Sequence, residues 1–322
     1  MLRESQVKGP ILSAPSPRPL GGPPAPPSQR DRLVAHLAML LFSALIAGSF
    51  TLGALAVPHI APAPLNAVRF ALAAVLMGAF AFGLQRRPFD LPRAPWRFAI
   101  MGMLVAVYFV TMMVGLTMAL PVAVSAVYTL VPLMAAAAAL VLMGQRSGPA
   151  VLASLAIAGL GSIWVIFRAD LAALLALRIG PGEMVFFVGC VCYAIYTPLL
   201  RKFSRGEPPV VQSFWTMTAA AVWIVAWSVP EFASVDWAGV PPFVWWSILY
   251  LAVGPTAICF FLVQFASLRL SSARVAAYGY LVPAYVIVLE GLAGRGWPSP
   301  GVLAGTAVIV LGLAVLAWLP ER

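Results

Sequence analysis

The chain has 322 residues, of which 62% are hydrophobic and 9% are charged, and its mean hydropathy is +0.97. A soluble domain carries about 25% charged residues, so this composition excludes a water-soluble globular fold. The formal net charge is +10, but the sequence contains no soluble basic domain that could bind a nucleic acid.

Residues 1–32 differ in composition from the rest of the chain. They include the stretch PSPRPLGGPPAPPSQRDR, which is rich in proline, glycine and arginine. Such a segment has too little apolar surface to bury, so we expect a disordered cytoplasmic tail. It lacks the short apolar run and cleavage site of a signal peptide.

Ten apolar segments follow the tail, and each is long enough to cross a bilayer as a helix, for which about 20 residues are needed. Polar or proline-rich breaks such as PHIAPAPLN and QRRPFDLPRAPWR separate them. The sequence therefore predicts an all-α integral membrane protein with ten transmembrane helices. The predicted spans are about 33–57, 65–84, 98–118, 122–143, 148–167, 183–201, 210–229, 243–268, 272–292 and 299–319.

The basic residues predict the orientation of these spans. With both termini in the cytoplasm, all but four of the 20 lysine and arginine residues fall in the tail, in cytoplasmic loops or at cytoplasmic span ends. The positive-inside rule favours this arrangement, which requires an even number of spans. The four exceptions are Arg69, Arg168, Arg178 and Arg295.

Two stretches of 24 residues resemble each other at a separation of 151 residues. AVYTLVPLMAAAAALVLMGQRSGP begins at Ala126 and AYGYLVPAYVIVLEGLAGRGWPSP begins at Ala277, which aligns Pro132 with Pro283. This offset divides the ten spans into halves, 33–168 and 181–319. Because each half has an odd number of spans, the halves enter the membrane from opposite sides, as in the inverted repeats of secondary transporters.

Further sequence features carry a resemblance to a known family. NAVRFALAAVLM at 66–77 opens the second span with an Arg-Phe pair. LTMALPVAVSAVYTLVPLMAAAAALVLMGQR at 116–146 joins spans three and four by a short link, and SLRLSSARVAAYGYLVPAYVIVLEGLAG at 267–294 is its counterpart. Together they resemble the EamA-type branch of the drug/metabolite transporter superfamily. The resemblance implies a bacterial inner-membrane protein that exports or exchanges small metabolites, often amino acids and in one branch aromatic ones.

The resemblance also implies a substrate cavity between the halves, lined by spans one, three, four, six, eight and nine. Hydroxyl, amide and aromatic groups in these spans suit a partly wet cavity, although a role in helix packing or an interfacial belt stays open. The candidate substrate-binding residues are Ser49, Tyr108, Tyr128, Tyr193, Tyr196, Gln264 and Tyr278.

Four residues are candidates for gating or coupling. Arg69 near the outer end of span two could attract anions or act in gating, or it could extend to the lipid headgroups. Glu290 could carry a proton, but Arg295 five residues later favours an ion pair. Pro132 and Pro283 each remove a backbone hydrogen bond and predict paired kinks.

The sequence thus favours a secondary transporter of small neutral or zwitterionic metabolites that works by alternating access through a central cavity. A carrier of drugs or nucleotide sugars with the same fold, and a membrane scaffold or receptor that does not transport, stay open. No phosphate-binding loop and no cluster of catalytic or metal-ligating side chains is present, so we expect neither enzymatic activity nor a cofactor or metal. The expected partners are a small-molecule substrate and the lipid bilayer; the oligomeric state is open and a monomer is compatible with the sequence.

Overall fold

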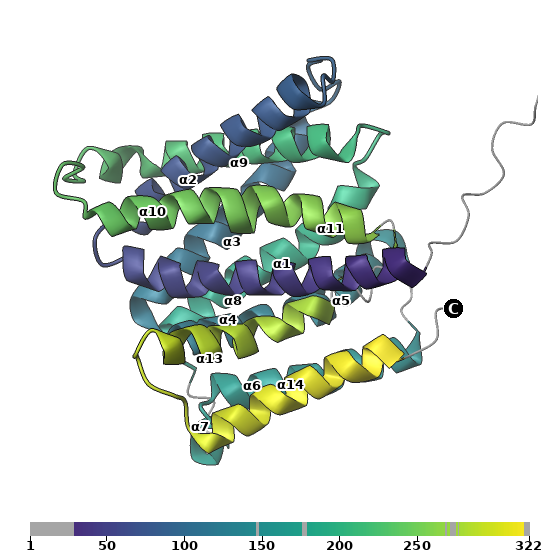
Figure 1. The fold of residues 1–322 in the computed structure, drawn as a ribbon, viewed down its shortest axis with the longest axis vertical. Coiled ribbons are helices and arrows are strands. Elements are labelled where there is room, and N and C mark those ends of the chain that lie inside the picture. The colour runs from purple at the N-terminus through teal and green to yellow at the C-terminus, as the bar shows by residue number, and fades with distance from the viewer. Residues whose placement is uncertain are drawn as a thin grey trace, which may run out of the picture.

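The computed structural model describes residues 29–145, 148–175, 179–267, 269–270, 275 and 277–318, and within these ranges the chain is helical without a strand (Figure 1). Within the described residues, eight helical stretches are long and apolar enough to span a membrane, and two shorter apolar helices follow them. The predicted all-helical, multi-pass fold is therefore confirmed. The elements are α1 Gln29–Ala56, α2 Pro62–Gly78, η1 Ala79–Leu84, α3 Pro95–Met118, α4 Pro121–Tyr128, α5 Val131–Met143, α6 Pro149–Ile166, α7 Leu171–Leu175, α8 Pro181–Lys202, α9 Pro209–Phe232, α10 Pro242–Leu251, η2 Ala252–Ile258, α11 Cys259–Ser267, η3 Tyr278–Leu281, α13 Val282–Leu292 and α14 Pro300–Trp318.

The start of the first helix and one additional short helix differ from the sequence prediction. The first helix begins at Gln29, so residues 29–32, predicted as part of the tail, are helical, and Asp31 lies in the first turn, where its charge favours the helix dipole. Residues 1–28 lie outside the described ranges. The short helix α7 was not predicted; it interrupts the link between α6 and α8.

Proline residues explain where most helices begin. A proline at the first helical position loses nothing, because its missing N–H would have no partner inside the helix and its φ already suits the helix. The prolines that interrupt the apolar runs of the sequence therefore also start the next helix. Helices that begin at such a residue include those starting at Pro62, Pro95, Pro121, Pro149, Pro181, Pro209, Pro242 and Pro300.

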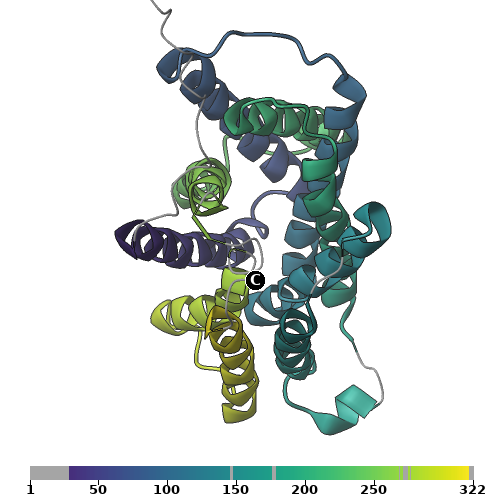
Figure 2. The same ribbon diagram turned by 90° about the vertical axis from the view of Figure 1, so that its right-hand side faces the viewer.

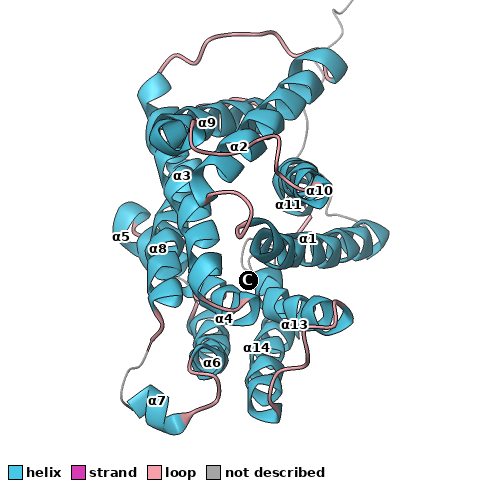
Figure 3. Ribbon diagram, turned by 90° about the vertical axis from the view of Figure 1, so that its left-hand side faces the viewer, coloured by secondary structure: helices cyan, strands magenta, loops and turns pink. Residues whose placement is uncertain are grey.

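The helices lie side by side in a bundle, with the start of α1 and the end of α14 at the same end of it (Figure 1). We call this the N-terminal end and the other the opposite end. Seen along the helices, α1, α10–α11 and α13 lie on one side, and α3, α5 and α8 lie on the other (Figures 2 and 3). The pairs α2–α9 and α6–α14 pack together and join the two sides at their edges.

The contacts between the two halves of the chain repeat when corresponding helices of the halves are exchanged. α3 packs on α8 as α10–α11 packs on α1, and α5 packs on α8 as α13 packs on α1. The two edge pairs, α2–α9 and α6–α14, each join corresponding spans of the two halves. Two related halves that face each other would produce this pattern of contacts.

Both repeat-related prolines lie where a span changes its helical geometry. α4 ends at Tyr128, and the backbone amides of Thr129 and Leu130 then bond to carbonyls three residues earlier before α5 begins. Pro132 is the second residue of α5, and Pro283 is the second residue of α13, directly after the 3₁₀ turn η3. Both spans are thus interrupted next to these prolines; the paired kinks and their gating role stay predictions.

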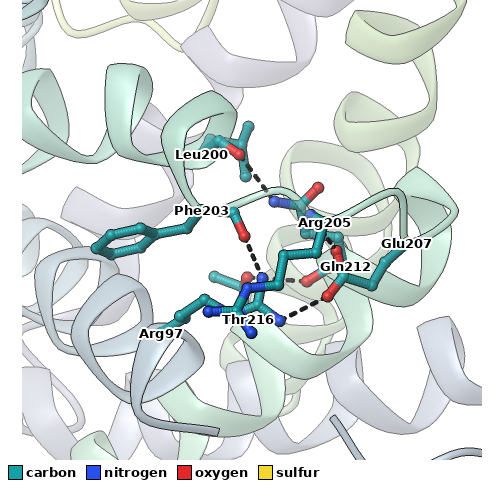
Figure 4. Close-up of polar contacts among 7 residues, drawn as sticks. All are labelled: Arg97, Leu200, Phe203, Arg205, Glu207, Gln212 and Thr216. Atoms are coloured by element: carbon teal, nitrogen blue, oxygen red, sulfur yellow. Dashed lines mark hydrogen bonds and ion pairs between the residues drawn. The ribbon is translucent and has the colours of Figure 1, made fainter. Parts of the chain in front are cut away.

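A buried ion pair joins α3 to the link between α8 and α9 at the N-terminal end (Figure 4). Arg97 is 2% exposed; its guanidinium donates to the carbonyl of Phe203 at the end of α8 and to Glu207 Oε1, at 2.6 Å for the second contact. Glu207 Oε2 accepts from the backbone amide of Arg205 at 2.7 Å. The positive-inside count treated Arg97 as a cytoplasmic surface charge, whereas it satisfies a carbonyl that the end of a helix leaves without a partner.

The side chain of Gln212 also links α9 to α8 near the Arg97–Glu207 ion pair. Its Nε2 donates to the carbonyl of Leu200 at 2.9 Å, which links the first turn of α9 to the last turns of α8. The backbone carbonyl of Gln212 accepts a hydrogen bond from Thr216 Oγ1 at 2.8 Å. Together with the Arg97–Glu207 pair, this fixes the α8–α9 corner against α3.

The acid sensitivity of this corner follows from Glu207. Partial burial of its carboxyl opposes ionisation, but hydrogen bonds from Arg97 and the backbone outweigh burial, so the pKa of Glu207 lies below its ordinary value of 4.5. Because the folded pKa is depressed, its contribution to stability is full above pH 4.5 and is lost as the pH falls through the folded pKa.

We therefore expect Glu207→Ala to lower the free energy of unfolding by up to about 3 kcal/mol at neutral pH, because Arg97 is left buried without its counter-charge. Glu207→Gln, which keeps an oxygen acceptor, should cost less. Thermal unfolding in detergent at pH 7 and pH 4 checks both, with the exposed Glu231→Ala as control. A Glu207→Ala protein with unchanged stability at pH 7 would contradict this interpretation.

The second prediction concerns topology. Gln85 follows η1 at the N-terminal end, and Ser234 lies beyond α9 at the opposite end; both are exposed. With Cys190, Cys192 and Cys259 replaced, Gln85→Cys should react with an impermeant thiol reagent from the cytoplasmic side and Ser234→Cys from the outside. Labelling of both from one side contradicts the fold, and a reversal of both contradicts only the orientation.

Candidate functional site

Aromatic rings from both sides of the bundle meet between α1, α3, α4 and α8. Tyr108 is the hub: its ring centroid lies 4.5 Å from that of Tyr193, 5.5 Å from Phe186 and 6.4 Å from Tyr128. Phe50 of α1 reaches across to Tyr128 at 6.3 Å. The central aromatic cluster consists of Phe50, Tyr108, Phe109, Tyr128, Phe186, Tyr193 and Tyr196.

The cluster contains four of the predicted site residues, and most of its hydroxyls are buried. Tyr108, Tyr128 and Tyr196 are at most 7% exposed. Among the described residues, the hydroxyls of Tyr196 and of Ser49, the neighbour of Phe50, have no hydrogen-bond partner. A buried hydroxyl without a partner costs about 1–3 kcal/mol, so a polar ligand that reached these groups would relieve this cost.

Tyr278 is not in the cluster. The hydroxyl of Tyr278 lies 2.6 Å from Nδ1 of His36, and its carbonyl accepts a hydrogen bond from Ser43 Oγ at 2.7 Å, so this residue is tied to the N-terminal part of α1. Whether Tyr278 takes part in substrate binding stays a prediction. The backbone of Gln264 belongs to α11, and its side chain lies outside the described part of the structure.

Arg69 is completely buried and does not extend to the headgroups, so the interpretation that its side chain snorkels is wrong. Its Nε and Nη2 donate to Thr256 Oγ1 at 3.3 and 3.2 Å. The guanidinium carbon lies 4.4 Å from the ring centre of Phe109, within the range of a cation–π interaction. Phe109 in turn contacts Tyr108 at 4.8 Å, so Arg69 adjoins the central aromatic cluster.

The hydroxyl of Thr256, which binds Arg69, lies next to a proline that changes the helical geometry of span eight. Pro255 has no N–H, so the carbonyl of Leu251 loses its usual helical donor, and the chain adopts the π-helix η2. Thr256 Oγ1 donates to that carbonyl at 2.8 Å and accepts from Arg69. The threonine hydroxyl therefore repairs the backbone and also anchors a cation from the other half of the chain.

Asn66 is not among the site residues predicted from the sequence. It is fully buried one turn before Arg69, and its Nδ2 donates to the carbonyls of Pro62 and Phe109 at 2.9 and 3.2 Å. The spacing i, i+3 between an asparagine and an arginine in an apolar run could have indicated it, because such residues share one helix face.

Glu290 lies at the end of α13, away from the aromatic cluster. It is 7% exposed, and its Oε2 accepts from Arg295 Nη1 at 3.1 Å. The ion pair that the sequence favoured is therefore formed; whether Glu290 has a part in coupling stays a prediction.

Comparison with known proteins places this arrangement in a family. The model of the EamA-like transporter family matches residues 33–167 and again residues 180–318. The chain belongs to the EamA-like transporter family. The predicted resemblance is thereby confirmed, and the two matched ranges follow the predicted halves to within a residue; the inversion of one half against the other stays a prediction.

Curated relatives of this EamA-like protein are distant but cover nearly its whole length. It is 27% identical over 294 residues to the aromatic amino acid exporter YddG of Ancylobacter novellus, covering 90% of this chain and 98% of that protein. It is 23% identical over 282 residues to the uncharacterized transporter YyaM of Bacillus subtilis, covering 86% and 92%. A solved crystal structure with 23% identity superposes with a TM-score of 0.67, covering 91% of this chain and 99% of the other, which shows a shared fold.

The anchoring of Arg69 can be tested through its partner. Thr256→Val removes an acceptor from a buried cation, and a hydrogen bond to a charged group contributes about 1.5–3 kcal/mol. The matched control is Thr216→Val, because the hydroxyl of Thr216 is also buried but bonds only to the Gln212 carbonyl in its own helix. Thr256→Val should lower the midpoint of thermal unfolding clearly more than the control. Equal losses would show that Thr256 does not support Arg69.

Proposed function

We propose that this EamA-like transporter is a secondary carrier that exports or exchanges small neutral or zwitterionic metabolites, foremost amino acids, across the bacterial inner membrane. The observation that carries the proposal is the central aromatic cluster, which brings ring faces and buried hydroxyls together between the two sides of the bundle. Rings bind apolar side chains, and hydroxyls bind polar head groups. The relative named as an aromatic amino acid exporter supports this substrate class.

Alternating access is proposed to use the two edges of the bundle. The pairs α2–α9 and α6–α14 hold the sides together, and between them Phe50 of α1 contacts the rings of Tyr128 in α4 and Phe186 in α8. Rocking of two inverted halves about the edge pairs would part these rings toward one membrane side at a time. The breaks at Pro132 and Pro283 allow the spans to bend during this motion.

The distribution of acidic residues supports transport without ion coupling. Carriers coupled to sodium or protons hold the ion with carboxylates near the middle of the membrane. In the described helices, the buried acids are Glu183 in the first turn of α8 and Glu290 near the end of α13, both toward the opposite end. The carboxylate of Glu290 also forms an ion pair with Arg295. A zwitterionic solute could then leave the cell down its own gradient.

Purified protein in liposomes tests the proposal. Radiolabelled L-phenylalanine should show counterflow with neither ATP nor a sodium gradient, and Glu290→Gln should retain the wild-type rate, with Arg295→Gln as the matched variant. Loss of downhill flux in folded Glu290→Gln, or concentrative uptake only under a proton gradient, would make Glu290 a coupling residue. Flux of drugs or nucleotide sugars in place of amino acids would favour a different carrier, and no flux of any of them a scaffold or receptor.

A further inference from the structure

One face of α2 presents a buried donor and a buried acceptor that no described residue satisfies. Arg69 Nη1 and Asn66 Oδ1 both lack a hydrogen-bond partner within the described ranges, and both residues are 0% exposed. They are three positions apart, so their side chains leave the helix in neighbouring directions. Phe109 of α3 contacts both: its carbonyl accepts from Asn66 Nδ2, and its ring packs against the Arg69 guanidinium.

The other large buried cation shows how differently Arg69 is placed. Arg97 has a carboxylate, Glu207, at 2.6 Å and a backbone carbonyl as acceptors, although its Nε has no partner within the described ranges. Arg69 has only the neutral hydroxyl of Thr256 and the faces of aromatic rings, and no acid in the described part of the chain pairs with it. Burial of a guanidinium without a counter-charge is costly, and an anion at Nη1 would offset that cost.

The chemistry of the pair matches the head group of an α-amino acid. A guanidinium binds a carboxylate strongly through charge-assisted hydrogen bonds, and an ammonium has donors for a free amide oxygen and no acceptors. A zwitterionic amino acid carries both groups on one carbon atom. Inorganic anions without a donor, such as chloride and sulfate, would satisfy Arg69 alone and would leave Asn66 Oδ1 without a donor.

We propose that Arg69 binds the carboxylate, and Asn66 Oδ1 the ammonium, of an α-amino acid whose side chain lies against the central aromatic cluster. Phe109 connects the two parts, because its ring lies 4.4 Å from the Arg69 guanidinium carbon and 4.8 Å from the ring of Tyr108. This inference rests on the proposed function and adds to it the recognition of the substrate's head group. The Thr256 hydroxyl positions the guanidinium from the opposite half of the chain.

Competition on the wild-type protein gives the first test and requires no variant. In counterflow of L-phenylalanine into liposomes, L-phenylalaninamide and phenethylamine lack the carboxylate, and N-acetyl-L-phenylalanine lacks the ammonium. Each should compete about tenfold to a hundredfold more weakly than L-phenylalanine, as expected for the loss of a hydrogen bond to a charged group. Equal competition by the amide and the amine would overturn the proposed role of Arg69, and equal competition by the acetyl derivative that of Asn66.

Variants give the second test. Arg69→Gln should raise the half-saturation concentration for L-phenylalanine by about tenfold or more and remove the preference over the amide, whereas Arg69→Lys should keep part of both. Asn66→Asp places a carboxylate beside Arg69 that competes with the substrate, so this variant should fold and lose flux. Arg97→Gln serves as the control, since loss of that buried arginine should reduce stability and leave the preference unchanged.

The outcomes separate the inference from the proposed function. Wild-type counterflow without discrimination among the four compounds, or folded Arg69→Gln and Asn66→Asp proteins with wild-type kinetics, overturns the head-group site and leaves an amino acid carrier. Absence of L-phenylalanine and other amino acid flux in the wild type overturns the proposed function, and the inference with it. If Arg69→Gln does not fold, the competition series and Asn66→Asp decide.

Discussion

The hydrocarbon core of a membrane contains no water, so each polar group within it must find a partner inside the protein. Regular helices meet this requirement for the backbone, which is why the chain is helical throughout its described spans. A proline inside a helix leaves one backbone carbonyl without its usual N–H donor, and in this structure a side chain donates to that carbonyl instead. At Pro255 the hydroxyl of Thr256 donates to the carbonyl of Leu251, which has lost its helical donor.

The same requirement distinguishes the two buried arginines. Arg97 is neutralised by Glu207 and fixes the α8–α9 corner to α3, which is a structural role. Each arginine keeps one guanidinium nitrogen without a partner in the described structure, but Arg69 is held only by a neutral hydroxyl and by ring faces. Buried polar groups in folded proteins are usually hydrogen-bonded, so an unpartnered donor and an unpartnered acceptor on one face of a helix point to a ligand.

The fold places Arg69 at a contact between the two halves of the chain. Arg69 belongs to the first half of the chain and Thr256 to the second, so the contact between them crosses from one half to the other. The aromatic cluster likewise joins α1 to the opposing α4 and α8 through ring contacts. A movement of the halves would therefore change the surroundings of the cation and of the rings together, which is what a carrier needs to bind on one side and release on the other.

Much of the fold could be read from the amino acid sequence because its determinants are local. Length and apolarity determine the spans, prolines determine where helices begin, and the repeated motif around Pro132 and Pro283 marks two equivalent breaks. The ion pair of Glu290 with Arg295 could also be predicted from the sequence, since the two residues are five positions apart. The contacts of Arg69 and Asn66, the pairing of Arg97 with Glu207 and the association of Tyr278 with His36 join residues 43 to 242 positions apart. They depend on which helices become neighbours, and only the tertiary structure decided that, because side-chain packing between apolar helices leaves no periodic signal in the sequence.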